Sequence, residues 1–430
     1  MHGIEEMTDL DHFYEHVIPE LYGPEEYQRS RYQSLVHSFM ENFDSESIHF
    51  ISSPGRTEIG GNHTDHNNGR VLAASINLDS VAAVSINDSD KIILRSEGFN
   101  DPIEVDLRKL ERNEEEKGNT TSLIRGIAYR FVEFGYNIGG FQGCMTSDVL
   151  PGSGLSSSAS VEVLIGSIFN YLFNEGRIFP EKIAQAGQYA ENKYFGKPCG
   201  LMDQMACAVG GIVSIDFKDP GDPQVEKIDF DFEPSAYRLV IVNTGGSHAD
   251  LTRDYSAIPE EMKAAAGWCG GVNMRDIERE KYMHMIPEMR KAIGDRAVLR
   301  GLHFLAENER VPKLVETLRK GELMVFLRLI RESGDSSFKW LQNIYSVKNS
   351  KEQGMALALA ITDDFIKRNG GTGACRVHGG GFAGTIQTFL PESYIRNYVE
   401  EIERVFGQKS ALALNIRNVG MHYFGEFLLD

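Results

Sequence analysis

Residues 151–160, PGSGLSSSAS, have the composition of a loop that binds phosphate groups. Glycines let the backbone approach an anion closely, and the serines lead into a helical pattern whose first N–H groups lack partners. Such a loop can hold nucleotide phosphates, with one hydroxyl available to a magnesium ion. It is not a Walker A loop, because no Gly-Lys-Ser/Thr follows. Taken alone, the residues fit a small-residue turn with a serine helix cap equally well.

A second segment, SPGRTEIGGNHTDHNNG (53–69), combines a cation, a carboxylate and neutral hydrogen-bonding groups in a glycine-rich stretch. A ligand rich in hydroxyl groups, such as a sugar, needs this mixture, because every buried hydroxyl must find a partner. The side chains concerned are those of Arg56, Asn62, His63, Asp65 and His66. A zinc site on the two histidines and the aspartate is the competing interpretation, although no third ligand at typical spacing supports it. Alternatively, the segment could be a structured loop with capped turns that binds no ligand.

Two further segments could contribute to the same site. In GKPCGLMDQMACAVGG (196–211), Asp203 lies between apolar neighbours. It either caps the helix that follows or acts as a base in a partly buried site. Glu191 lies near the end of the preceding helical pattern, where most glutamates are exposed. The glycines of VHGGGFAGT (377–385) permit a tight approach of the backbone to a ligand or to another loop.

The elements that must position these segments follow from the spacing of apolar residues. Helical spacing covers 10–43, interrupted at Pro24, and 123–133, 160–173, 181–195 and most of 260–349. Strand patterns cover 48–51, 71–86, 91–96, 141–149, 210–217, 238–243 and the end of the chain, with a turn predicted at 53–55. Because strands come first, helices cluster in the middle and strands return, the order favours an α+β fold over repeating βαβ units.

Composition excludes several classes of function. The chain has 430 residues, with 44 Lys and Arg against 62 Asp and Glu, a net charge of −18. An acidic chain gains nothing from counterion release on nucleic acid, and anionic membrane surfaces repel it. No stretch approaches the roughly 18 apolar residues of a membrane helix, and the acidic N-terminus is not a targeting signal. The five scattered cysteines indicate reduced thiols, so we expect a cytoplasmic protein.

Together, the four segments resemble the galactokinase family, within the larger group of kinases that phosphorylate galactose, homoserine, mevalonate and phosphomevalonate. PGR…HTD…NG, PGSGLSSSAS and GGGFAG match in order and spacing, and PCGLMDQ is similar to the stretch that carries the family's catalytic aspartate. The resemblance spans about 51–389. It implies a two-lobed sugar-kinase fold with the active site in the cleft. Residues 1–212 would form a mixed-sheet lobe with the sugar and phosphate loops, and 213–430 a lobe of antiparallel sheet and helices.

The resemblance also assigns roles by position. Asp203 would take the proton from the anomeric hydroxyl of a sugar, and Arg56 would stabilise negative charge on the attacking oxygen and the transferred phosphoryl group. The ATP-phosphate loop would comprise Gly152, Ser153, Gly154, Leu155, Ser156, Ser157, Ser158 and Ala159, with Ser158 and Glu191 as Mg²⁺ ligands. The sugar contacts would be Asn62, His63, Asp65, Gly200 and Tyr255. ATP and Mg²⁺ are the implied cofactors, transfer would be direct and in line, and a monomer is favoured.

The segment 53–69, which we call the sugar segment, departs from the family pattern GRVNLIGEHTDY at two informative positions. The glutamate that contacts the 6-hydroxyl of the sugar is replaced by Asn62, and the tyrosine after the aspartate by His66. A neutral amide neither repels a carboxylate at carbon 6 nor demands a hydroxyl there, so galacturonate and L-arabinose are alternatives to galactose. Galactose ranks first because PCGLMDQ and GLSSSAS match that branch. The same residues could also belong to a non-catalytic sugar sensor or to a zinc hydrolase. The complete Ser156–Ala159 stretch and Asp203 favour a catalytic kinase over the sensor, and zinc stoichiometry would decide on the hydrolase.

Overall fold

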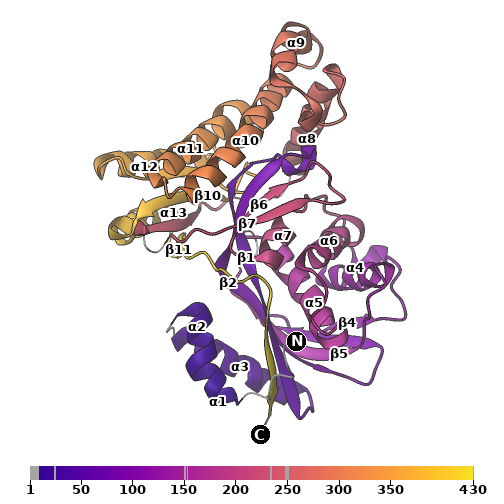
Figure 1. The fold of residues 1–430 in the computed structure, drawn as a ribbon. Coiled ribbons are helices and arrows are strands. Elements are labelled where there is room, and N and C mark those ends of the chain that lie inside the picture. The colour runs from indigo at the N-terminus through magenta and orange to yellow at the C-terminus, as the bar shows by residue number, and fades with distance from the viewer. Residues whose placement is uncertain are drawn as a thin grey trace.

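The computed structural model of the protein describes residues 9–23, 26–149, 152, 154–232, 235–246 and 251–429. Within these residues the strands form two sheets (Figure 1). The larger is mixed, because β3 and β5 run parallel whereas the other pairs are antiparallel. In spatial order it contains β12 (His422–Leu428), β1 (Ser47–Gly60), β2 (Arg70–Ile86), β5 (Phe141–Ser147), β3 (Lys91–Ser96) and β4 (Ile103–Asp106), with β6 (Ile212–Asp216) and β7 (Gln224–Ile228) extending from β2.

Helices cover both faces of the larger sheet (Figure 1). One layer contains α1 (Leu10–His12), η1 (Phe13–Val17), α2 (Ile18–Tyr22) and α3 (Glu26–Asn42), and the other α4 (Thr120–Glu133), α5 (Ser157–Phe173), α6 (Pro180–Ala190) and α7 (Met202–Val209). Along β2, Val81 and Ala83 pack against the first layer, and Ala82 and Val84 against the second. Because strand side chains alternate between faces, a strand buried on both sides is apolar throughout, as this part of β2 is.

The smaller sheet is antiparallel and is also covered on both faces. Its strands are β11 (Ala411–Leu414), β8 (Tyr237–Asn243), β10 (Thr385–Pro391) and β9 (Ala374–Val377). The helices of this lobe are α8 (Thr252–Trp268), α9 (Arg279–Ala292), α10 (Asp295–Arg319), α11 (Leu323–Ser336), α12 (Gly354–Arg368) and α13 (Ile395–Phe406). Helices α10 and α11 share one core with β8 and with Ile59 and Leu72 of the larger sheet, which joins the two lobes.

The structure confirms the predicted α+β architecture with a mixed sheet in one lobe and an antiparallel sheet with helices in the other. Sheet membership does not follow the expected division between residues 212 and 213. That boundary falls inside β6, which pairs with β2, and both β7 and β12 belong to the larger sheet. A division by sheets therefore comes after Ile228, with the last strand returning to the first lobe.

The turn predicted at Ser53–Gly55 is wrong, because β1 continues through these residues to Gly60. The pairing of β1 with β2 shifts register between Pro54 and Arg56, so the strand accommodates the proline at an irregularity. A Cβ atom on Gly55 would lie 2.9 Å from the carbonyl oxygen of Leu155. The glycine therefore permits the serine-rich loop to pack directly on β1.

The N-terminal helices are anchored by a buried carboxylate in β2. Asp79 in β2 is fully buried and accepts hydrogen bonds from Arg31 of α3 (2.7 Å) and from Arg417 (2.7 Å). Tyr22 donates to the same carboxylate at 2.5 Å. This cluster ties the helical layer to the chain segment that precedes β12.

Two expectations concern the chain as a whole. All five cysteines lie in described residues and are free thiols, four of them buried, in agreement with the prediction from their spacing. In the part of the chain that the structure describes, none of the helices combines the length and the apolar character that a membrane crossing requires.

Candidate active site

Arg56 and Asp203, far apart in sequence, form a two-point ion pair. The Nε and Nη2 atoms of Arg56 each lie 2.6 Å from one carboxylate oxygen of Asp203. Arg56 belongs to β1, and Asp203 lies in the first turn of α7. The side chain of Arg56 is 7% exposed and that of Asp203 is 30% exposed, so a ligand can reach the carboxylate while the guanidinium is held beneath it.

The surroundings of Asp203 keep its carboxyl group ionised. Burial raises the pKa of Asp203. The positive charge and hydrogen bonds of Arg56, together with a hydrogen bond from the Ser156 hydroxyl, lower the pKa by more than burial raises it, so the pKa lies below its ordinary value. At neutral pH the carboxylate can therefore accept a hydrogen bond, or a proton, from a hydroxyl group placed against it.

The serine-rich loop reaches the same place. Arg56 donates from Nη1 to the carbonyl oxygen of Gly154 at 2.6 Å, and from its backbone N–H to that of Leu155 at 3.0 Å. Gly154 has a φ of +74°, and a Cβ atom there would lie 2.4 Å from Thr385 Oγ1, so the position requires glycine. The loop leads into α5, whose first N–H groups suit an anion. Of the predicted phosphate-loop residues, Ser153 lies outside the described residues.

Ser158 and Glu191, predicted as Mg²⁺ ligands, are in contact. The Ser158 hydroxyl donates to Glu191 Oε1 at 3.1 Å, and Glu191 is buried at the start of the π-helical turn η4 (Glu191–Phe195). Lys197 Nζ lies 2.8 Å from the same carboxylate oxygen. A hydroxyl and a carboxylate are oxygen ligands of the kind that Mg²⁺ prefers, so this pair fits the ion.

Asp65 and Gly200 lie directly against each other. Asp65 begins the short turn η2 (Asp65–Asn67) and accepts a hydrogen bond from the backbone N–H of His66 at 2.9 Å. A Cβ atom on Gly200 would lie only 1.7 Å from Asp65 Oδ2. The absence of a side chain at Gly200 is therefore what allows the Asp65 carboxylate to occupy its position.

His63 is held by a chain of hydrogen bonds to the second lobe. Its Nε2 donates to the carbonyl oxygen of Gly380 at 2.9 Å, which leaves Nδ1 to accept from His66 Nε2 at 3.2 Å. Burial lowers the pKa of His63 to about 4, so the ring is neutral. Tyr255 reaches the same glycine loop, since its hydroxyl donates to the Gly381 carbonyl at 2.8 Å. These bonds place both predicted sugar-contact side chains against the 379–384 loop.

The zinc interpretation finds no support in this geometry. His63 and His66 are hydrogen-bonded to each other rather than converging on a common point. Among the described residues, no group of three histidine, cysteine, aspartate or glutamate side chains is arranged to hold a metal ion.

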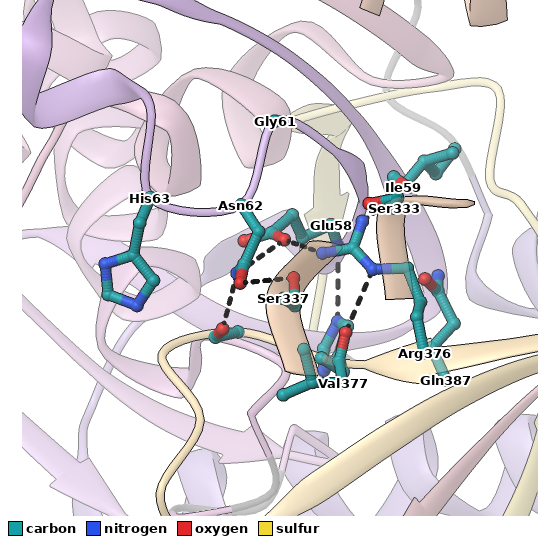
Figure 2. A network of polar contacts seen from close by, with 12 residues as sticks. Glu58, Ile59, Gly61, Asn62, His63, Ser333, Ser337, Arg376, Val377 and Gln387 are labelled. Atoms are coloured by element: carbon teal, nitrogen blue, oxygen red, sulfur yellow. Dashed lines mark hydrogen bonds and ion pairs between the residues drawn. The ribbon is translucent and has the colours of Figure 1, made fainter. Parts of the chain in front are cut away.

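Asn62 lies in an environment different from the one expected (Figure 2). It is fully buried, and its Nδ2 donates to Glu58 Oε1 (3.0 Å) and to the Gly379 carbonyl (2.8 Å). Its Oδ1 accepts from Ser337 (3.2 Å) and from Asn343 (3.0 Å). All four hydrogen-bonding positions of the amide are thus filled by protein groups. In this arrangement the Asn62 side chain is directed at protein groups, and its expected contact with a sugar hydroxyl stays a prediction.

Both family models and individual proteins of known name are similar in sequence to this chain. A family model described as the galactokinase galactose-binding signature matches residues 37–86, and one described as the N-terminal domain of GHMP kinases matches residues 122–211. A galactokinase from Actinobacillus pleuropneumoniae serotype 5b is 28% identical over 396 residues, which cover 91% of this chain and 98% of that protein. One from Glaesserella parasuis serovar 5 is 30% identical, covering 83% of this chain and 89% of the relative.

The chain belongs to the galactokinase family. Its fold agrees with that of a crystal structure of Lactococcus lactis galactokinase complexed with galactose, with a TM-score of 0.78 at 22% identity over 91% of this chain and 99% of that one. A mevalonate kinase structure is more distant, with a TM-score of 0.57 at 18% identity over 86% of this chain and 99% of the other. Membership makes the protein a sugar kinase, and kinases of this family use ATP.

This galactokinase-family site contains a cation that the sequence did not single out. Lys197 contacts Glu191, and its positive charge adds to the larger effect of Arg56 in lowering the pKa of Asp203. The available signal was its position directly after Gly196, where the helical pattern stops, and six residues before Asp203. Its partner carboxylate is nearby in sequence, but the shared site becomes evident only once η4 brings the two together.

The raised pKa of Asp65 predicts that the free energy of unfolding depends on pH. Burial, followed by the negative charge of Asp203, raises the pKa of Asp65 from 3.8 to about 7. The folded state therefore binds this proton more tightly than the unfolded chain, and stability is lost as the pH rises from about 4 to about 7. We expect Asp65→Asn to remove the loss and to raise the free energy of unfolding at pH 8 by on the order of 2 kcal/mol.

Urea denaturation of wild type and Asp65→Asn at pH 8 and pH 4 measures this difference. The difference should shrink toward zero at pH 4, where Asp65 is protonated in the folded state and only about half ionised in the unfolded chain. An equal or larger stabilisation at pH 4 would show that Asp65 does not titrate in this way.

Proposed function

We propose that the protein transfers the γ-phosphoryl group of ATP to the anomeric hydroxyl of galactose, giving galactose 1-phosphate and ADP. The observation that carries the proposal is the Arg56–Asp203 ion pair, whose guanidinium also donates to Gly154 of the serine-rich loop. A base and a phosphate-binding loop are thus joined through one cation. The two relatives described above, both named galactokinase, support galactose as the sugar.

The chemistry assigns one task to each group. The anomeric oxygen attacks the γ-phosphorus, its proton passes to the Asp203 carboxylate, and the bond from phosphorus to the β,γ-bridging oxygen breaks to release ADP. Arg56 keeps Asp203 ionised and lies close enough to the loop to offset negative charge on the transferred group. Phosphoryl transfer depends mainly on alignment and charge stabilisation, which these groups provide without a covalent intermediate.

Ser158 and Glu191 would hold Mg²⁺ in this proposal. When bound, the ion neutralises charge on the phosphate oxygens of ATP. Lys197 places a second positive charge beside Glu191, and its exposed side chain can move aside or contact the nucleotide. Ser158 lies in the first turn of α5, so the pair that would hold the ion lies where the serine-rich loop ends.

The structure alters the case for sugars that differ from galactose at carbon 6. Galacturonate and L-arabinose are alternatives if Asn62 faces that carbon, but in the structure its amide is hydrogen-bonded to protein groups. Asp65 and His63 are the side chains proposed to bind the sugar hydroxyls. We also place the protein in the cytoplasm and expect a monomer whose partners are the sugar and ATP.

A substrate panel tests the proposal. Galactose, galacturonate, L-arabinose, N-acetylgalactosamine and mevalonate are each supplied with Mg-ATP, and ADP release is followed in a coupled assay. We expect the highest kcat/KM with galactose and no turnover with mevalonate. A higher kcat/KM with another sugar would correct the substrate, and sugar binding without ADP release would indicate a sensor.

A further inference from the structure

The network in Figure 2 joins the sugar segment to the second lobe through residues that the proposed reaction does not use. Glu58 of β1 and Arg376 of β9 form a buried ion pair of 2.5 Å, with side chains 3% and 0% exposed. Arg376 also donates from Nη1 to the Ile59 carbonyl (2.7 Å) and from Nε to the Val377 carbonyl (3.0 Å). Each of its nitrogens has an acceptor, and the Glu58 carboxylate balances its charge.

Only an amide suits position 62 beside this pair. The nitrogen of Asn62 faces two acceptors, the Glu58 carboxylate and the Gly379 carbonyl, while its oxygen faces two donors, on Ser337 and Asn343. A carboxylate in its place would bring an oxygen against Glu58 and another acceptor, burying a second negative charge at 3.0 Å. The network therefore holds one carboxylate and one amide in a defined order.

This network fixes the position of the sugar segment against the glycine loop at 379–384. Asn62 and His63 donate to consecutive carbonyls of the glycine loop, those of Gly379 and Gly380. The backbone carbonyl of Asn62 also accepts from His303 Nε2 of α10 at 2.9 Å. In Figure 2 the His63 ring points away from the network, so its position depends on the neighbouring residue being held. A shift of Asn62 would move His63 and, two residues later, Asp65.

We propose that Glu58, Asn62 and Arg376 form a positioning unit that sets the sugar affinity of the site without touching the sugar. Its carboxylate and amide hold the sugar segment on the glycine loop, so that His63 and Asp65 are presented correctly. The family pattern GRVNLIGEHTDY has an amide and a carboxylate at these two positions in the opposite order, so the pair keeps the same two groups here. The inference deepens the proposed sugar kinase function and rests on it.

Three variants test the unit. Asn62→Asp adds a second carboxylate and is expected to raise the KM for the sugar by about tenfold or more, with the KM for ATP within about twofold of wild type. Glu58→Gln leaves the Arg376 charge unbalanced and should be similarly impaired. The double variant Glu58→Gln/Asn62→Asp again has one carboxylate and one amide, and we expect it to recover most of the sugar affinity lost in Asn62→Asp.

Two further variants keep the test decisive. Ser337→Ala removes one hydrogen bond to Asn62 (3.2 Å) without adding charge, and should raise the sugar KM by about threefold even if the charged variants fail to fold. Thr362→Val is the matched control, because it breaks a buried hydrogen bond to Tyr398 (2.7 Å) far from the sugar segment. It should lower the melting temperature and leave the sugar KM unchanged.

The outcomes separate this inference from the function on which it rests. A wild-type protein that phosphorylates no sugar contradicts the proposed function before any variant is compared. With an active wild type, the positioning unit is overturned if Ser337→Ala and Asn62→Asp keep the wild-type sugar KM, if the KM for ATP rises as much as that for the sugar, or if the folded double variant is no better than Asn62→Asp.

Discussion

Replacing Asp203 by asparagine is expected to lower kcat by about 10²–10⁴-fold, the contribution typical of a positioned general base. Asparagine has nearly the same shape and can still accept a hydrogen bond from Arg56, but it cannot take the proton of a hydroxyl group. Because the serine-rich loop is held by Arg56 and β1 rather than by Asp203 alone, the KM for ATP should stay within about threefold of wild type. Steady-state kinetics with galactose and Mg-ATP measure both constants.

Asp216→Asn provides the matched control for this variant. Asp216 accepts hydrogen bonds from Arg70 and Arg275, each at 2.8 Å, so it is also an aspartate paired with arginine, but at the end of β6. Its kcat should remain near that of wild type. Wild-type kcat in Asp203→Asn would show that Asp203 is not the base. An equal loss of kcat in Asp216→Asn would show that the loss comes from disrupting an aspartate–arginine ion pair and not from removing a base.

Adding one methyl group at Gly200 is expected to lower kcat/KM for the sugar by about 100-fold. The new Cβ atom would lie 1.7 Å from Asp65 Oδ2, a separation that two non-bonded atoms cannot adopt. Either Asp65 must leave its position, or the segment that carries Gly200 must shift and take Asp203 with it. Each movement misplaces a group that the proposed reaction needs, whereas the binding of ATP alone should change little.

Gly267→Ala is the control for the effect of replacing a glycine. Gly267 lies near the end of α8, and a Cβ atom there meets nothing within 4 Å. Because alanine favours a helix more than glycine does, this variant should be as stable as wild type or slightly more so, with unchanged kinetics. Wild-type kcat/KM in Gly200→Ala would mean that Asp65 does not contribute to sugar binding.

Local patterns predicted many of the elements up to residue 349, whereas helices α12 and α13 were not predicted. Strand β3 has the bounds read from its alternating residues, and α3, α5 and β2 agree with the pattern within three residues at either end. What local patterns do not contain is pairing between distant segments. The return of β12 to β1 and the pairing of β6 with β2 depend on partners more than a hundred residues away.

The same distinction applies to the site. The types of Arg56, Asp203, Ser158 and Glu191 indicated chemistry, and the structure brings each pair into contact. The surroundings of Asn62 could not be predicted, because the two partners that occupy its amide oxygen, Ser337 and Asn343, are about 280 residues away. A polar side chain beside a binding loop can serve the ligand or the scaffold, and only the positions of its partners distinguish the two.

The most direct test of the central claim follows the anomeric oxygen itself. Galactose labelled with ¹⁸O at carbon 1 is incubated briefly with the protein and Mg-ATP, and the product is examined by ³¹P NMR. Attack of that oxygen on phosphorus, with its proton passing to Asp203, predicts galactose 1-phosphate that retains the label in the C–O–P bridge, seen as an isotope shift of the phosphorus resonance. A sugar phosphate without the label, or one with its phosphate on another carbon, would contradict the account.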